Sequence, residues 1–119
     1  RKKDKNKNII KDKKIGNILI REQILKDFPP KALRSVIDQG KKDIKSGIII
    51  SISTFEDKVG LAVGISKDLT SKYDAVELVK VASVILGGKG GGGRKDFAQA
   101  GGVDSSKIDE ALEKLKSLI

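Results

Sequence analysis

The sequence predicts an α/β fold in which helices cover a small mixed β-sheet, preceded by a basic N-terminal arm. Short β-branched runs alternate with segments whose apolar residues recur at helical spacing, and these segments carry helix-start signals. The expected order is β-α-β-β-α-(glycine loop)-α. Residues 1–14 are expected to be an arm or linker from an upstream region, and residues 15–119 a single domain.

The first half of the chain contains three predicted strands and one helix. Lys14–Arg21 reads as a strand, and a helix over about residues 31–46 follows two prolines, with Gly47 suited to the position after its end. Ile48–Ser53 and Val59–Ile65, separated by a polar turn, predict an antiparallel hairpin. The apolar face of the helix comprises Leu33, Val36, Ile37, Gly40 and Ile44.

Two further helices are predicted in the second half. Asp74, with Glu77 three residues later, forms a capping box, and a last helix starts near Ser105 or Ser106. The first of these helices has the apolar face Ala75, Leu78, Val79, Ala82, Ile85 and Leu86, and the second has Ile108, Ala111, Leu112, Leu115, Leu118 and Ile119. Both faces are expected to lie in the core.

The missing residue types exclude most familiar active sites. With His 0 and Cys 0, the chain has no imidazole or thiolate for a catalytic triad, a Cys-His pair or an ordinary zinc site, and its acidic residues form no spaced cluster. We therefore expect no catalytic residue, metal ligand or cofactor in this chain. No apolar run is long enough to span a bilayer, and a cytoplasmic location is expected. The chain starts at Arg1 and has Met 0, so we expect it to be part of a longer protein.

Positive charge is concentrated at the N-terminus. The chain carries a net charge of +9, and residues 1–14 contain eight basic and two acidic residues, a net +6. The remaining residues are only mildly basic, at +3. Such an arm could bind a polyanion independently of sequence, but lysine-rich ends are more often solvated linkers, and we favour the linker.

The most informative segment is residues 87–102, which hold eight of the 13 glycines. Ordering glycine costs much entropy, so this composition indicates positive φ angles or the close approach of another group. A flexible linker would not continue into RKDFAQAGG between two helices. A phosphate-binding loop is also disfavoured, because such loops precede a helix and the GxxxxGK[ST] pattern is absent.

Three basic residues in this segment, Lys89, Arg94 and Lys95, could attract a polyanion. Aromatic residues make up only 3% of the chain, too few for a base-stacking platform. Contacts with the phosphates and shape of a folded RNA fit better.

The segment GGKGGGGRKDFAQAGG resembles the glycine-rich signature near the C-terminus of bacterial alanyl-tRNA synthetases. The resemblance extends over about residues 15–119 and includes KALRSVID, SGIIISIS, EDKVGLAVGISKDLT and DAVELVKVASVILGG. A related domain is appended to DHH-type phosphoesterases.

The resemblance implies a non-catalytic role in alanine–tRNA ligase. The family's domain contacts the elbow of tRNA(Ala), helps the upstream aminoacylation and editing domains engage one tRNA, and can support a homodimer. It also implies ATP, Mg and zinc for the parent enzyme, in its upstream part. The expected tRNA-binding residues are Lys89, Arg94, Lys95, Gln99, Gly91 and Gly92, whereas Phe97 is expected to pack under the loop.

Two alternative functions stay open. A substrate-binding appendage of a DHH-type phosphoesterase usually carries a histidine in its glycine-rich motif, and this chain has none. A dimerisation module without RNA binding would have an exposed apolar face on its last helix.

Overall fold

A six-stranded mixed sheet forms the centre of the computed structural model, which describes residues 9–88 and 90–119. The strands lie in the order β1-β2-β3-β4-β6-β5. Neighbours β2 and β3 are parallel, and the other neighbouring pairs are antiparallel. The strands are β1 (Ile9–Ile15), β2 (Ile18–Lys26), β3 (Ile48–Phe55), β4 (Lys58–Ile65), β5 (Gly91–Arg94) and β6 (Phe97–Gly102).

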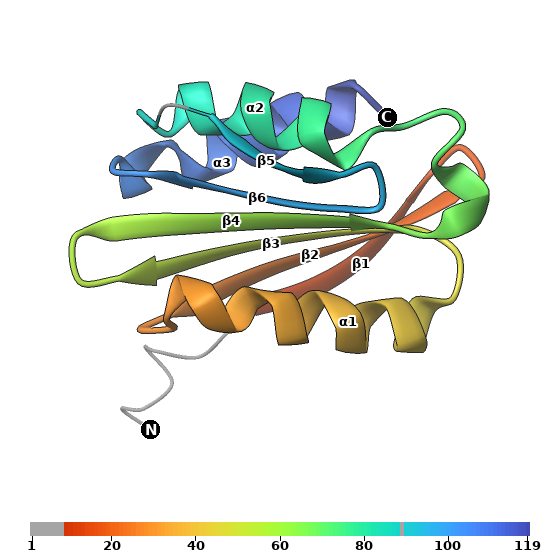
Figure 1. Ribbon diagram of the computed structural model, residues 1–119, viewed down its shortest axis with the longest axis horizontal. Helices are drawn as coiled ribbons and strands as arrows, with labels where there is room; N and C mark the ends of the chain where they lie inside the picture. Colours follow the sequence, from red (N-terminus) through yellow and green to blue (C-terminus); the bar gives the residue numbers. More distant parts are fainter. Residues whose placement is uncertain (1–8, 89) are drawn as a thin grey trace.

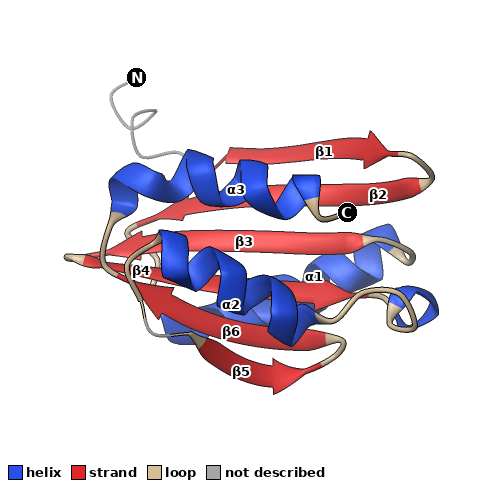
Figure 2. Cartoon of the chain, turned by 90° about the horizontal axis from the view of Figure 1, so that it is seen from above, coloured by secondary structure: helices blue, strands red, loops and turns tan. Residues whose placement is uncertain are grey.

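Helices cover both faces of the sheet (Figure 1). Helix α1 (Leu33–Ile44) lies on one face, and α2 (Ala75–Ile85) and α3 (Ile108–Ser117) lie side by side on the other (Figure 2). Short 3₁₀ turns occur at Pro30–Ala32, Lys67–Leu69 and Ser105–Lys107. In the described part of the chain, no helix is long and apolar enough to cross a membrane. The predicted fold class, a mixed sheet covered by helices, is confirmed.

The core consists of two layers, one on each side of the sheet. The layer under α2 and α3 takes alternate residues of β3 and β4, among them Ile50, Ile52 and Leu61. The thinner layer under α1 takes Ile49 and Ala62 from the opposite side of the same strands. Because side chains alternate across a strand, the continuous apolar run of β3 supplies both layers.

The local predictions for the central hairpin and the helices are confirmed. Strands β3 and β4 pair as an antiparallel hairpin, and the Asp74 carboxylate caps α2 by accepting a hydrogen bond from the Val76 amide at 2.9 Å. Buried residues of the predicted helix faces are Leu33, Ile37, Gly40, Ala75, Leu78, Val79, Ala82, Leu86, Ile108, Ala111, Leu112 and Leu115.

Two predictions at helix ends are wrong. Leu118 is 43% exposed, because α3 ends at Ser117 and the chain leaves the core there. Gly47 does not terminate α1. The helix ends at Ile44, and the residue with a left-handed backbone is Lys45, at φ 70°.

The N-terminal region contains one strand more than expected. Instead of a single strand over Lys14–Arg21, β1 and β2 form a hairpin around a two-residue turn, with Ile15 paired to Ile18. Residues 9–14, expected in the arm, therefore belong to the sheet, whereas residues 1–8 lie outside the described residues. An edge strand tolerates exposed charge and often carries it. Because β1 contains three lysines, its sequence predicts an arm and not a strand.

Gly64 of β4 allows α1 to approach the sheet closely. A Cβ at this position would collide with Cγ2 of Ile37, a β-branched side chain with little freedom to move. Gly40 of α1 is similarly close to Ile49, since a Cβ added to Gly40 would lie only 3.2 Å from that side chain. Small residues on both elements thus set the height of α1 above the sheet.

We expect Gly64→Ala to destabilise the protein by about 1–3 kcal/mol, because the added methyl group overpacks the layer under α1. The measurement is urea unfolding monitored by circular dichroism. Gly92→Ala is the matched control, since nothing lies within 4 Å of its added methyl group. Equal stability of the Gly64 and Gly92 variants would contradict this account of α1 packing.

Candidate functional site

The glycine-rich segment forms a β-hairpin rather than the predicted loop. Strand β6 pairs with β4, from Gly64 opposite Phe97 to Val59 opposite Gly102, and β5 pairs with β6. Strand β5 is consequently the edge of the sheet, and all four of its residues are exposed. Glycine has low strand propensity, so the local sequence does not predict these strands. They form because the backbone of β4 has an edge with which β6 can pair.

The glycines of this hairpin have different roles. At Gly91 a Cβ would collide with the backbone oxygen of Gln99 and with Ala100 on the paired strand. At Gly92, by contrast, a Cβ would meet nothing within 4 Å. Gly91 is therefore required by the packing of the hairpin itself, whereas Gly92 presents bare backbone to the outside.

Ser83 of α2 fixes the base of the hairpin. Its buried hydroxyl donates a hydrogen bond to the Gly101 carbonyl at 2.8 Å and accepts one from the Gly90 amide at 3.0 Å. In addition, the Gly88 amide donates to the Ser83 carbonyl at 2.8 Å. One serine thereby links the helix to β6 and to the residue that precedes β5.

The tip of the hairpin, Lys95-Asp96, is fixed as well. Its two carbonyls accept hydrogen bonds of 2.9 Å from the first amide of α2 and the last amide of β4. The Asp96 carboxylate lies 3.6 Å from Lys41 Nζ of α1 and 3.8 Å from Arg94 Nε. The hairpin is therefore held at both ends before any partner binds.

Several functional candidates share the face of the sheet on which α1 lies. Phe97 packs into the layer under α1, and the antiparallel register places Arg94 opposite Phe97 and Gly92 opposite Gln99. The guanidinium of Arg34, at the start of α1, lies over the Phe97 ring at 5.0 Å from its centroid. We call the set Arg34, Gly92, Arg94, Phe97 and Gln99 the hairpin surface.

The positively charged residues of the hairpin surface, Arg34 and Arg94, are exposed. The Arg94 side chain is 70% exposed, and the carboxylate of Asp96 is shared between Arg94 and Lys41. Exposed Arg34 adds a second guanidinium, which lies over an aromatic ring. Two planar donor groups beside bare glycine backbone can contact phosphate oxygens without steric hindrance from side chains.

The predicted site residues are only partly assembled on this surface. Gly92, Arg94 and Gln99 lie on one face, although Gln99 is half-buried and already has an interaction within the protein. Lys95 is exposed at the tip, and Gly91 is occupied by strand pairing. Lys89 lies outside the described residues. Phe97 is buried, at 9% exposed, but it packs into the layer under α1 and not, as predicted, under the glycine-rich segment.

Arg34 was not predicted from the sequence. It follows the apolar Leu33 in a helix with two other basic residues, Lys41 and Lys42, and no local signal distinguishes it from them. Its position over Phe97, the residue paired with Arg94, arises only because β6 brings Phe97 under the start of α1.

Residues 9–88 and 90–119 contain no candidate metal-binding site. No group of three or more Asp or Glu side chains gathers there in a way that could hold an ion.

Comparisons with known proteins assign the family. The DHHA1 domain model matches residues 16–119. The alanine–tRNA ligase of Parvibaculum lavamentivorans is 46% identical over 105 residues, which cover 87% of this chain and 12% of that protein.

Solved structures agree with this assignment. The C-Ala domain of Aquifex aeolicus alanyl-tRNA synthetase superposes with a TM-score of 0.85 at 30% identity, covering 91% of this chain and 96% of that one. A DHH-domain protein described as a member of the s1p family of ribosomal proteins gives 0.57 at 20% identity, over 91% of this chain and 27% of that one. The second likeness shows the shared fold alone.

The chain belongs to the DHHA1 domain family. Within that family it is a domain of the alanyl-tRNA synthetase C-terminal type, as the resemblance of the glycine-rich segment predicts. It spans about 12% of the length of the Parvibaculum ligase that it matches.

We expect Ser83→Ala to loosen the hairpin while the rest of the fold persists, because the Gly101 carbonyl and the Gly90 amide lose their shared partner. The free energy of unfolding should fall by about 1–3 kcal/mol. Amide hydrogen exchange should also become several-fold faster at Gly90–Gly93. Ser117→Ala, at an exposed serine in the last turn of α3, serves as the control. Unaltered exchange in the hairpin would show that Ser83 does not anchor it.

Proposed function

We propose that this domain is a non-catalytic RNA-contacting module of alanine–tRNA ligase, which grips the elbow of tRNA(Ala) with the hairpin surface. It helps the aminoacylation and editing domains of the same chain engage one tRNA, and it can assist dimerisation. The observation that carries the proposal is Arg94: a largely exposed guanidinium on an edge hairpin that is fixed at both ends and adjoins the bare backbone of Gly92.

The fixed hairpin favours recognition of a shaped surface. Hydrogen bonds from α2 and β4 order the hairpin in the free protein, so binding does not have to order it. Arg34 is similarly pre-positioned by the Phe97 ring. A rigid arrangement of planar donors suits an RNA whose phosphates are themselves held by tertiary structure, as in the elbow of a tRNA.

The chemistry of the enzyme is proposed to lie elsewhere in the parent protein. This chain has His 0 and Cys 0, so the zinc, ATP and Mg implied for an alanine–tRNA ligase fall to other domains, and no cofactor is proposed for this one. A cytoplasmic location follows from the proposed role in aminoacylation.

The alternatives have less support. The likeness to a DHH-domain protein is at 20% identity, against 46% for the ligase. A pure dimerisation module would need an exposed apolar face on α3, yet in the described residues that face is buried from Ile108 to Leu115, with Leu118 exposed beyond it.

We expect Arg94→Ala to weaken tRNA binding by about 1.5–3 kcal/mol, because the variant loses a charge-assisted contact with phosphate. The slope of log K against log salt should fall by about one phosphate equivalent. Filter binding at several salt concentrations, with intact tRNA and a duplex of similar charge, measures both effects. Lys80→Ala is the control, since Lys80 is exposed on α2 at the opposite face of the sheet.

Gly92→Ala tests the shape of the interface without a change in charge. Because its methyl group meets no protein atom within 4 Å, the fold should be retained, and weaker tRNA binding would report close approach of the RNA. Gly91 is excluded from this test because a Cβ there would collide with β6. Unchanged affinity of both the Arg94 and Gly92 variants, with stability intact, would remove the hairpin from the interface.

The basic N-terminus is tested by removing residues 1–8 rather than 1–14, so that β1 is retained. We expect the truncated protein to lose some affinity and salt sensitivity but to keep its preference for intact tRNA over the duplex. Loss of that preference would assign recognition to the N-terminal residues instead.

The isolated chain is expected to neither activate alanine nor deacylate mischarged tRNA. ATP–pyrophosphate exchange and deacylation assays on the folded protein measure these activities. Activity that copurifies with the domain, after removal of contaminating host enzyme, would contradict a purely binding role.

A further inference from the structure

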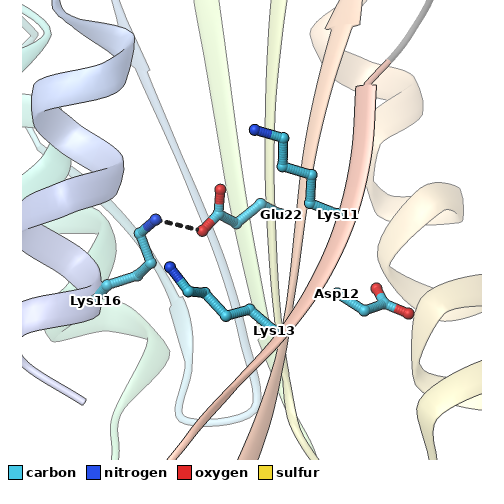
Figure 3. Close-up of a pocket in the computed structure, with 5 residues that line it drawn as sticks. All are labelled: Lys11, Asp12, Lys13, Glu22 and Lys116. Carbon is cyan, nitrogen blue, oxygen red and sulfur yellow. Dashed lines mark ion pairs between the residues drawn. The ribbon is translucent and has the colours of Figure 1, made fainter.

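A cationic cleft lies at the opposite edge of the sheet from the hairpin. It is situated between β1, β2 and α3, on the face that carries α2 and α3, and has a volume of about 400 Å³. Its lining consists of Lys11, Asp12, Lys13, Glu22 and Lys116 (Figure 3).

The pairing of β1 with β2 directs two lysines into this cleft. Lys11 lies opposite Glu22 and Lys13 opposite Ile20, and Ile20 belongs to the core layer under α2 and α3. Figure 3 shows the ammonium groups of Lys11, Lys13 and Lys116 converging on the space around Glu22, whereas Asp12 points away. Because side chains alternate along a strand, Lys14 lies on the other face.

One ion pair forms the floor of the cleft. Lys116 Nζ lies 2.7 Å from the Glu22 carboxylate, and the two side chains are only 16% and 10% exposed. The Lys116 ammonium donates a hydrogen bond to the Glu22 carboxylate, and this bond raises the pKa of Lys116, outweighs the opposing effect of burial and keeps the group charged. Glu113, at 3.7 Å from Lys116, is 79% exposed and points to solvent.

The charges of Lys11 and Lys13 are not neutralised inside the cleft. Glu22 is committed to Lys116, and the Asp12 carboxylate is bound to Arg21 at 2.8 Å on the other side of the sheet. Neither Lys11 nor Lys13 makes an ion pair with another described residue. Two exposed ammonium groups therefore flank the Glu22–Lys116 pair without an ion pair of their own among the described residues, an arrangement that attracts anions.

We propose that this cleft is a second phosphate-binding site of the domain, which holds the backbone of a single nucleic-acid strand between Lys11 and Lys13. The inference rests on the proposed RNA-binding function but concerns a different face and edge of the sheet. Residues two apart on a strand are separated by about 6.8 Å, a distance comparable to that between successive phosphates of an extended strand. Lysine binds phosphate as a point charge and needs no planar geometry.

The test compares three lysines of one strand. Lys11→Gln and Lys13→Gln should each lower the slope of log K against log salt for a labelled oligouridylate by about 0.7, and together by about 1.4. Lys14→Gln removes the same charge from β1 on the opposite face, and its slope should equal that of the unmodified chain. Fluorescence anisotropy over a salt series measures these slopes. Equal slopes for the Lys13 and Lys14 variants would overturn the proposal.

Glu22→Gln provides a test of opposite sign. Removal of this negative charge from the floor of the cleft should tighten oligouridylate binding, and thermal unfolding checks that the fold survives. A folded Glu22→Gln protein that binds more weakly would overturn the proposal. The comparison of lysines remains decisive if the variant does not fold.

Two further measurements separate the possible partners and the two sites. Polyglutamate that competes more effectively than oligouridylate at equal charge would overturn the proposal and assign the cleft to an acidic polypeptide.

Arg94→Ala should leave unchanged the part of the oligouridylate salt slope that Lys11 and Lys13 contribute. Loss of that contribution in the Arg94 variant would contradict a separate site. The hairpin proposal is judged independently, by the preference of the Arg94 and Gly92 variants for intact tRNA.

Discussion

The close approach of α1 to β4 is the constraint on which the rest of the structure depends. Because Gly64 has no side chain, Ile37 can pack directly on the strand, and α1 is seated over β3 and β4. That position leaves Arg94 and Gly92, on the outer strand, open to solvent. It also carries Arg34 over Phe97, so the helix contributes a charge to a surface that is otherwise built from the hairpin.

The sequence predicts this fold where local signals and tertiary contacts agree. The apolar faces of the helices, the Asp74 cap and the β3–β4 hairpin all have periodic or capping patterns that can be recognised within a few residues. Strands β1 and β6 have no such pattern. Four of the seven residues of β1 are charged, and β6 follows a glycine run, so both strands form because a neighbouring strand offers backbone groups to pair with.

In the candidate site, too, some residues could be predicted from local sequence and others acquire their role only from tertiary contacts. Arg94 and the exposed glycine backbone could be predicted because a glycine run with basic residues is unusual in any ordered segment. The sequence could not predict which glycines are required by the packing of the hairpin and which are available to a partner. Gly91 is explained by its contact with β6 alone, so glycine content overstated the surface available to a partner. Arg34, Lys11 and Lys13 acquire their positions from elements distant in sequence, and their local sequence does not mark them as site residues.

The two edges of the sheet meet the same physical problem in different ways. An edge strand presents unpaired backbone groups that invite another strand, and lysines on β1 discourage such pairing. Strand β5 has little side-chain protection, since three of its four residues are glycine, but it is short and glycine disfavours extension of the sheet. Under the proposed function, its open backbone contacts a partner that does not add a strand. A phosphate backbone, which can accept hydrogen bonds from amides and guanidinium groups without sheet pairing, satisfies that requirement, and in the proposed cleft the lysines that protect the other edge would contact the same class of partner.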